Sequence, residues 1–285
     1  MVIKFFRLQV RYNAYLFRFA FKVEPKFFRH ITFFLIIAFT LPYFIIRFIF
    51  FALGELHFKL RKHFHDAHKA IKLKTGEQII LPLYRSDYIQ KVIFSSKSYF
   101  ELDILVRLKN KYIQPNFVIL DIGANIGNHC LYFARQCFAQ KVFAFEPLPQ
   151  TYKMLVENVR VNQLNSVIKT YNLGVSDEEG FAEVAISPKG NIGGTSIKKV
   201  EGGNIKLVSI DREFNFERLD FIKIDVETFE LFVLNGLIET IKRHKPIILM
   251  EIFEKNFEQA NQILCNLGYS VYEEFKGFNY LFALT

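Results

Sequence analysis

Cysteines are few in this chain, and their spacing excludes two common kinds of site. The 285 residues include three, Cys130, Cys137 and Cys265. They form no Cys-x-x-Cys pair and leave an odd one over, so neither a zinc site nor a disulfide framework is predicted, and we expect no bound metal. The favoured interpretation is that they are small packing residues in a reducing compartment.

Tryptophan is absent, whereas phenylalanine occurs 34 times and hydrophobic residues make up 51% of the chain. Such a composition is far too apolar for a disordered protein. The length suits one good-sized domain with an appendage. The net charge of +9 favours a polyanion or an anionic membrane surface as partner.

The first 70 residues differ in composition from the rest and are predicted to form a helical module that associates with a membrane. Basic residues recur at helical intervals through 4–22, which predicts a basic amphipathic helix. Residues 31–54 are almost wholly apolar, interrupted only by Pro42 and Arg47, and are long enough to span a bilayer. The segment lacks a cleavage pattern of small residues, so we do not expect its removal.

Basic residues flank the apolar segment on both sides, so both flanks favour the cytoplasm. A helix broken at Pro42 that dips into one leaflet and returns satisfies both flanks. A true span and an apolar helix pair packed on the domain or on a partner remain as alternatives. Residues 1–70 and 71–285 are therefore treated as separate domains.

Residues 117–127 carry the strongest signal in the chain. The apolar run 117–120 predicts a buried parallel strand, followed by Asp121 and a turn with Gly123, Asn125 and Gly127, and then by a helix over 129–136. This order brings backbone N–H groups close to a nucleotide-like ligand. The turn lacks the opening glycine of a dinucleotide site, and the carboxylate there would repel a pyrophosphate. A positively charged ligand is therefore favoured, such as S-adenosylmethionine.

A second acid supports a nucleoside ligand. Residues 141–145 predict the next strand, which ends on Glu146 and Pro147, about 20 residues beyond the glycines. At this separation an acid binds ribose hydroxyls. We therefore predict that Glu146 binds the ribose of the cofactor.

The remaining pattern predicts an α/β fold with a mostly parallel, doubly wound sheet and an antiparallel edge strand. The expected elements are a hairpin over 71–83, mostly helix over 86–112, a helix over 150–162, strands at 167–173, 181–186 and 206–210 around a glycine-rich loop at 189–203, a strand at 219–225 with a helix to about 242, a strand at 246–251, a helix over 255–267 and a closing hairpin over 269–284. The ligand should lie across the carboxyl ends of the strands.

Four segments together resemble the FkbM family of S-adenosylmethionine-dependent methyltransferases: 121–128, 145–147, 221–230 and 246–251. The resemblance covers about residues 71–285 and implies a class I, Rossmann-like methyltransferase fold. It also implies methyl transfer to a hydroxyl, typically on a sugar or a polyketide-like acceptor. The family usually has glycine where this chain has Thr228. Glycine permits positive φ, which a β-branched residue resists, so Thr228 puts the acceptor pocket in question.

Each candidate residue has an expected role in such a site. The carboxylate of Asp121 would pair with the ammonium of S-adenosylmethionine, and Glu146 would bind its ribose. The remaining cofactor contacts would come from Gly123, Asn125, Gly127, Asn128, Pro147 and Asp225. The candidates for taking the acceptor proton are Asp225, Glu227, Glu251 and His129. Asp225 and Glu227 could instead cap the helix that begins near Thr228, and His129 could be bonded locally.

The favoured function is a membrane-associated O-methyltransferase with its catalytic domain in the cytoplasm, where the cofactor is. The expected partners are the membrane and a carbohydrate or lipid-linked glycan acceptor. An RNA methyltransferase is an alternative, but the cations concentrate beside membrane-like sequence and no RNA-binding fold is recognisable, so nucleic acid is not expected as a partner. A non-enzymatic scaffold with a decayed cofactor fold is the other alternative, motivated by Thr228.

Overall fold

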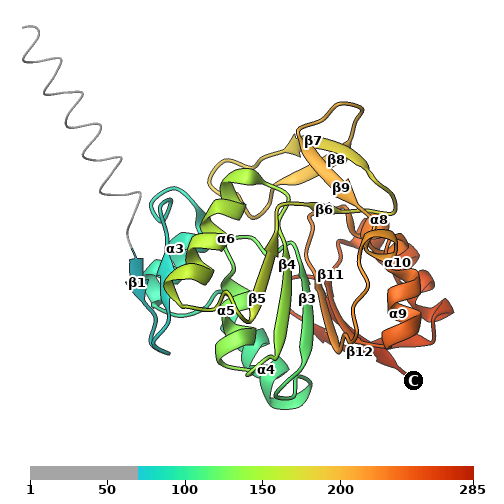
Figure 1. Cartoon of the computed structure of the whole chain (residues 1–285), viewed down its shortest axis with the longest axis horizontal. Coiled ribbons are helices and arrows are strands. Elements are labelled where there is room, and N and C mark those ends of the chain that lie inside the picture. The colour runs from blue at the N-terminus through green and yellow to red at the C-terminus, as the bar shows by residue number, and fades with distance from the viewer. Residues whose placement is uncertain (1–69) are drawn as a thin grey trace, which may run out of the picture. The chain divides into compact units, whose positions relative to one another are not determined.

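A computed structural model describes residues 70–285, and its centre is a seven-stranded sheet (Figure 1). The order of the strands across this sheet is β12-β13-β11-β10-β3-β4-β5. Their bounds are β3 (Val118–Ile122), β4 (Lys141–Phe145), β5 (Ile168–Tyr171), β10 (Phe221–Ile224), β11 (Ile247–Glu251), β12 (Tyr269–Phe275) and β13 (Asn279–Leu284). The order reverses between β3 and β10, which leaves a crevice at the carboxyl ends of these strands.

Six of the seven strands run in the same direction, as predicted, but the reversed strand is not at the edge. β13 pairs antiparallel with β11 on one side and with β12 on the other. Because two reversals restore the direction, β12 runs parallel to β11 and forms the edge itself. The closing hairpin folds back so that its second strand inserts between β11 and β12.

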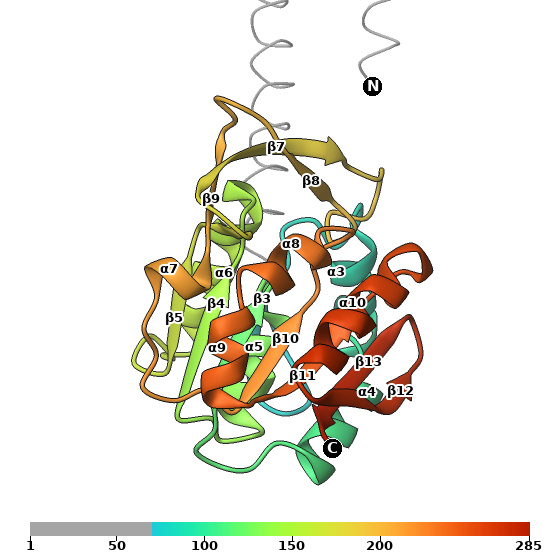
Figure 2. The same ribbon diagram turned by 90° about the vertical axis from the view of Figure 1, so that its right-hand side faces the viewer.

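Helices cover both faces of the sheet, which explains why the central strands are apolar on both sides. Every residue of β3 and β10 is buried. One face carries α3 (Tyr88–Ser96), α4 (Leu102–Lys111), α5 (Asn128–Arg135) and α6 (Pro149–Val161). The other carries α8 (Glu230–Asn235), α9 (Ile238–His244) and α10 (Glu254–Asn266) (Figure 2). Two separate hydrophobic cores result, one on each face.

The predicted opening hairpin is confirmed as β1 (Ala70–Lys72) paired antiparallel with β2 (Gln78–Ile80). It is tied to α6, because the backbone N–H of Ile80 donates to Asn158 Oδ1 at 2.6 Å. The helical stretch predicted next is two helices, α3 and α4, rather than one. They are separated by a break with positive φ at Lys97 and Glu101, which ends α3 and begins α4.

A second, four-stranded sheet lies beyond the carboxyl ends of the central strands (Figure 2). Its strands are β6 (Gly174–Val175), β7 (Gly180–Ile186), β8 (Ser196–Lys199) and β9 (Ile205–Val208), and the short helix α7 (Ile210–Glu213) follows it. The glycine-rich stretch expected to be all loop therefore contains a strand, β8, which pairs with β7. Residues 187–195 form the loop between β7 and β8, and residues 200–204 form the turn between β8 and β9.

The single helix predicted after β10 is also two, α8 and α9, divided at Gly236. A Cβ atom on Gly236 would lie 2.0 Å from the carbonyl oxygen of Ser176. The close approach of the small sheet therefore requires glycine here, and the chain turns at this point.

The predicted membrane module lies outside the described residues, apart from Ala70. Within 70–285, no helix combines the length and the apolar character that crossing a bilayer requires.

Candidate active site

Two cavities lie side by side at the carboxyl ends of β3, β4, β10 and β11. The first lies toward β4, between Glu146, the start of α6 and the small sheet. The second lies toward β11 and is lined by residues from the start of α3, the segment before α4, the start of α5, β10 and β11. Both cavities are lined by Gly123, Asn125, Gly193, Asp225 and Glu227. They are therefore two parts of one crevice.

The glycine of the turn after β3 is required by a close approach of two strands. Gly123 has φ +82°, and a Cβ atom on it would lie 1.7 Å from the carbonyl oxygen of Asp225. Gly127, by contrast, lines neither of these cavities. Its φ is +87°, and a Cβ there would lie 2.7 Å from Leu155 Cδ1, so Gly127 lets α5 pack against α6. Gly127 thus has a packing role, and its predicted cofactor contact stays a prediction.

Glu146 lies in the first cavity and holds the turn in place. Its two carboxylate oxygens accept the backbone N–H groups of Asn125 and Leu148, each at 2.9 Å. Burial raises the pKa of Glu146 to about 7, although the two N–H groups act in the opposite direction. Each carboxylate oxygen has a second lone pair, so both can still accept a ligand hydroxyl. Pro147 lines the same cavity.

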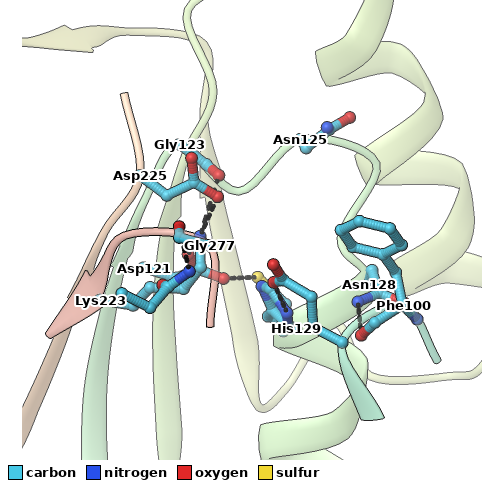
Figure 3. A network of polar contacts seen from close by, with 12 residues as sticks. Phe100, Asp121, Gly123, Asn125, Asn128, His129, Lys223, Asp225 and Gly277 are labelled. Atoms are coloured by element: carbon cyan, nitrogen blue, oxygen red, sulfur yellow. Dashed lines mark hydrogen bonds and ion pairs between the residues drawn. The ribbon is translucent and has the colours of Figure 1, made fainter. Parts of the chain in front are cut away.

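Asp121 does not face the crevice, which corrects the expectation that its carboxylate pairs with the ammonium of the ligand. The residue is fully buried and lines neither cavity. Its Oδ1 lies 3.5 Å from Lys223 Nζ, and its Oδ2 accepts a hydrogen bond from Cys130 Sγ at 3.0 Å (Figure 3). The reason is the strand register, which pairs Asp121 of β3 with Lys223 of β10 and so places both side chains on the same face.

The cysteines fit the packing interpretation only in part. Cys130 and Cys137 are buried and free, whereas Cys265 is free and exposed. Burial, reinforced by the charge of Asp121, raises the pKa of the Cys130 thiol well above its usual range. Cys130 is thus a neutral hydrogen-bond donor beneath the crevice.

Lys223 is the main charged residue that the sequence interpretation missed. Its ammonium is 3.0 Å from Asp225 Oδ2, and its side chain is only 4% exposed (Figure 3). Burial alone would lower the pKa of Lys223, but the charges of Asp225 and Asp121 outweigh it and raise the pKa. Lys223 therefore stays charged between two carboxylates. A single lysine in the otherwise apolar strand 221–224 was the available signal.

The four predicted proton acceptors come together at the second cavity. Asp225, Glu227, Glu251 and His129 all line it. Glu101, at the start of α4, also lines this cavity and was not predicted. Its Oε2 lies 3.4 Å from His129 Nε2, so His129 has a local partner within the site.

The carboxylates of the second cavity differ in charge because their surroundings differ. Burial and the neighbouring Asp225 charge raise the pKa of Glu251 to about 10, so Glu251 is protonated at neutral pH. Burial opposes ionisation of Asp225 as well, but Lys223 and the hydrogen bond with Glu251 hold the pKa of Asp225 below its usual value. Burial and the charges of Asp225 and Glu230 raise the pKa of Glu227 to about 7.

Thr228 occupies a backbone conformation that suits glycine, as expected from the glycine that the FkbM family usually has at this position. Its φ is +78°, and that of Glu227 is +49°. The Thr228 N–H donates to Glu230 Oε1 at 2.7 Å, which holds the turn in this shape. A buried glutamate thus caps the turn before α8, while Glu227 lines both cavities.

The two asparagines of the turn differ in what their side chains do. Asn125 has φ +51°, and its Oδ1 accepts the Ile126 N–H at 2.8 Å. The Asn128 amide accepts the Phe100 N–H at 3.0 Å and donates to the Phe100 carbonyl at 3.2 Å (Figure 3). Although Asn128 lines the second cavity, both ends of its amide are used to hold the segment before α4.

A loop from the small sheet covers the crevice. Ile192 and Thr195 line the first cavity, and Asn191 lines the second. The loop is attached to the start of α3, where Asp87 Oδ2 accepts the Ile192 N–H at 2.8 Å. The sequence predicted the glycine-rich loop but not this attachment.

Comparison with known proteins identifies the family. The sequence model of the methyltransferase FkbM domain matches residues 121–271, more than half of the chain. The chain belongs to the FkbM methyltransferase family. The predicted resemblance is thereby confirmed, and membership of this family supports S-adenosylmethionine as the cofactor.

Several proteins are similar in sequence to this FkbM chain. Methyltransferase sdnD from Sordaria araneosa is 30% identical over 191 residues, which cover 54% of this chain and 70% of sdnD. Hexuronic acid methyltransferase AglP from Haloferax volcanii is 28% identical over 148 residues, which cover 51% of this chain and 60% of AglP.

AMB antimetabolite synthetase AmbE from Pseudomonas aeruginosa is 26% identical over 228 residues, or 65% of this chain. The matched part is 10% of AmbE, so this chain spans a small part of that relative's length. Among solved structures, methyltransferase FkbM from Methylobacillus flagellatus aligns with a TM-score of 0.43 at 19% identity, covering 59% of this chain and 43% of that one.

The residues of the first cavity fit the adenosine part of S-adenosylmethionine. Its walls include Phe145, Leu148, Leu173 and Val175, which provide an apolar slot of the kind that a nucleobase occupies. Glu146 adds a carboxylate that can accept from a ribose diol.

Proposed function

We propose that this chain transfers the methyl group of S-adenosylmethionine to a hydroxyl oxygen, on a glycan or glycolipid at the cytoplasmic face of a membrane. Family membership supports methyl transfer. The name of AglP, a hexuronic acid methyltransferase, supports a sugar acceptor. The basic and apolar sequence of residues 1–70 supports a lipid-linked acceptor near a membrane surface.

The observation that carries this proposal is the junction of the two cavities at Asp225 and Glu227. One cavity suits a nucleoside, and the other is lined by hydrogen-bonding and titratable groups suited to a polyhydroxyl compound. An acceptor in the second cavity would meet the cofactor where the two cavities join. Proximity of this kind accounts for much of the acceleration of a two-substrate reaction.

In the first cavity, Glu146 would bind the ribose, and Gly123 and Asn125 would form the backbone wall beside the methionine part. Asp225 is held in place by Lys223, and its carboxylate can pair with the positive charge of the cofactor. When bound, S-adenosylmethionine supplies an electrophilic methyl group on a sulfonium sulfur that leaves with the bonding electron pair.

The acceptor hydroxyl loses its proton during the reaction, and Glu227 is the group best suited to take it. A general base works best when its pKa lies near the working pH, and that of Glu227 is raised to about 7. Glu251 is protonated at neutral pH and serves instead as a hydrogen-bond donor. His129 is engaged by Glu101, so it is the weaker candidate.

The acceptor class can be tested in cells that carry the gene. Glycan and lipid extracts from cells with the gene, without it, and without it but complemented by the full-length chain would be compared by mass spectrometry. We expect one glycan or glycolipid species to lose the mass of a methyl group without the gene. Complementation should restore the methyl group, and Glu227→Gln should fail to restore it.

The matched control for this substitution is Glu217→Gln, a change at an exposed glutamate that lines neither cavity. It should restore methylation as the unchanged chain does. Loss of a methyl group from RNA digests, with glycans and lipids unchanged, would contradict the sugar acceptor. No change in any extract would support a non-enzymatic role.

A further inference from the structure

Thr151 is a buried polar residue whose hydroxyl has no hydrogen-bond partner. It lies in the first turn of α6, is 2% exposed, and lines the first cavity together with Glu146. Among the described residues, four have a buried side-chain atom of this kind. They are Tyr99, Asp121, Thr151 and Asn191.

The other three atoms have explanations that do not apply to Thr151. The Asp121 oxygen lies near the Lys223 ammonium, and the hydroxyl of Tyr99 interacts with Glu77. Asn191 belongs to the loop that covers the second cavity. Thr151 lies in a helix and no ion pair or loop position explains its hydroxyl, and buried hydroxyls in native proteins are nearly always bonded.

The position of Thr151 in α6 does not account for it either. A threonine at a helix start usually accepts a backbone N–H as the N-cap residue. Here the N-cap is Leu148, and Thr151 stands three residues later, inside the first turn. Free backbone N–H groups at a helix start also favour an electron-rich atom nearby.

We propose that the Thr151 hydroxyl donates a hydrogen bond to an acceptor atom of the adenosine part of the cofactor. This inference rests on the proposed function, because it takes the first cavity to be the adenosine site. The cavity has apolar walls at Phe145, Leu148, Leu173 and Val175, so a ring nitrogen or a ribose oxygen of a nucleoside bound there would supply the missing partner. Thr151 and Glu146 would then bind the nucleoside from two neighbouring elements, α6 and β4.

The proposal makes opposite predictions for the ligand-free protein and for its complex. Thr151→Val keeps the shape of the side chain but removes the hydroxyl. Without ligand, the variant no longer buries an unsatisfied group, so its melting temperature should equal or exceed that of the unchanged protein. Its Kd for S-adenosylhomocysteine should rise about tenfold, the change expected from losing one hydrogen bond.

Isothermal calorimetry and thermal melting of the full chain provide both readouts. Thr151→Ser keeps the hydroxyl and should bind within about twofold of the unchanged protein. A matched control is Thr240, which is also buried in the first turn of a helix but donates to Asp211 Oδ1 at 2.6 Å. Thr240→Val should lower the melting temperature and leave S-adenosylhomocysteine binding unchanged.

Two results would overturn the inference. The first is a Thr151→Val variant that binds S-adenosylhomocysteine as tightly as the unchanged protein. The second is a fall in its melting temperature without ligand, which would show that the hydroxyl has a structural partner. Failure of the unchanged, folded protein to bind S-adenosylhomocysteine would instead overturn the cofactor site itself, so the two failures are distinguishable.

Discussion

Lys223 carries a buried ammonium that holds the pKa of Asp225 below its usual value. Its ammonium lies 3.5 Å from Asp121 Oδ1 and 3.0 Å from Asp225 Oδ2, and the charges of Asp225 and Asp121 raise the pKa of Lys223. A buried ion of this kind is costly to leave unpaired. Lys223 therefore supports the crevice from beneath, while Asp225 lines both cavities.

Replacing Lys223 with methionine should destabilise the protein strongly. The change leaves Asp121 and Asp225 without a counter-ion, and the free energy of unfolding should fall by about 3 kcal/mol or more in urea titrations. Adding Asp121→Asn should recover part of the loss, since one of the two unpaired charges is then removed. Lys242→Met, at an exposed pair with Glu239, should cost less than about 1 kcal/mol. Equal losses in Lys223→Met and Lys242→Met would contradict this account.

Thr228 stores strain in the turn that carries Glu227. A β-branched residue at φ +78° is unfavourable, so Thr228→Gly should raise the free energy of unfolding by about 1 kcal/mol. Thr228→Ala keeps the Cβ atom and should give a clearly smaller gain. If glycine destabilised the protein more than alanine did, the strain would not be real.

At the scale of elements, the crevice depends on how a loop of the small sheet is attached to α3. Asp87 makes this attachment with one carboxylate oxygen and caps α3 with the other, which accepts the Gln90 N–H at 2.9 Å. The residue is 4% exposed, so both bonds are shielded from water. The loop over both cavities is thereby fixed to an element that is distant in sequence.

Asp87→Ser separates these two functions. Serine is a good N-cap and should preserve α3, but its shorter side chain cannot also reach the loop. Hydrogen–deuterium exchange should accelerate in residues 187–195 and remain unchanged in α3. S-adenosylhomocysteine affinity should fall by about threefold to tenfold, because ligand binding must then order the loop. Unchanged exchange in 187–195 would show that the attachment does not hold it.

The contrast between local and long-range features explains which parts of this site the sequence could predict. The turn after β3 and Glu146 were predictable because glycine spacing and strand-tip acids are local patterns. The orientation of Asp121 was not, since it depends on the register with β10, about 100 residues away. The place of β13 between β11 and β12 also depends on long-range pairing. A hairpin pattern in the sequence does not show which of its two strands will pair with β11.

At the scale of the whole molecule, one buried and two half-buried glutamates make stability depend on pH. The pKa values of Glu146 and Glu227 are raised to about 7, and that of Glu251 to about 10. A carboxyl whose pKa is raised on folding prefers to be protonated in the folded state. The stability that such a carboxyl contributes is fully present when the pH is below its unfolded pKa, near 4.5. This stability is lost as the pH rises through its folded pKa.

The ligand-free protein should therefore lose stability as the pH rises from about 5 to about 9. Thermal melting across this range should show the decline, and Glu251→Gln should make it shallower because glutamine does not ionise. The lowered pKa of Asp225 acts only below this window, so it does not offset the effect. A melting temperature that rose steadily over the same range would contradict the assignment of these groups as protonated.

The central claim is that the crevice at the ends of β3, β4 and β10 binds the cofactor through Glu146. Calorimetric titration of the full chain with S-adenosylhomocysteine tests it most directly. We predict one site per chain, a Kd at least about tenfold weaker for Glu146→Ala, and no change for Glu157→Ala, whose side chain pairs with Arg160 on the surface of α6. Equal binding by the unchanged protein and Glu146→Ala would contradict the account.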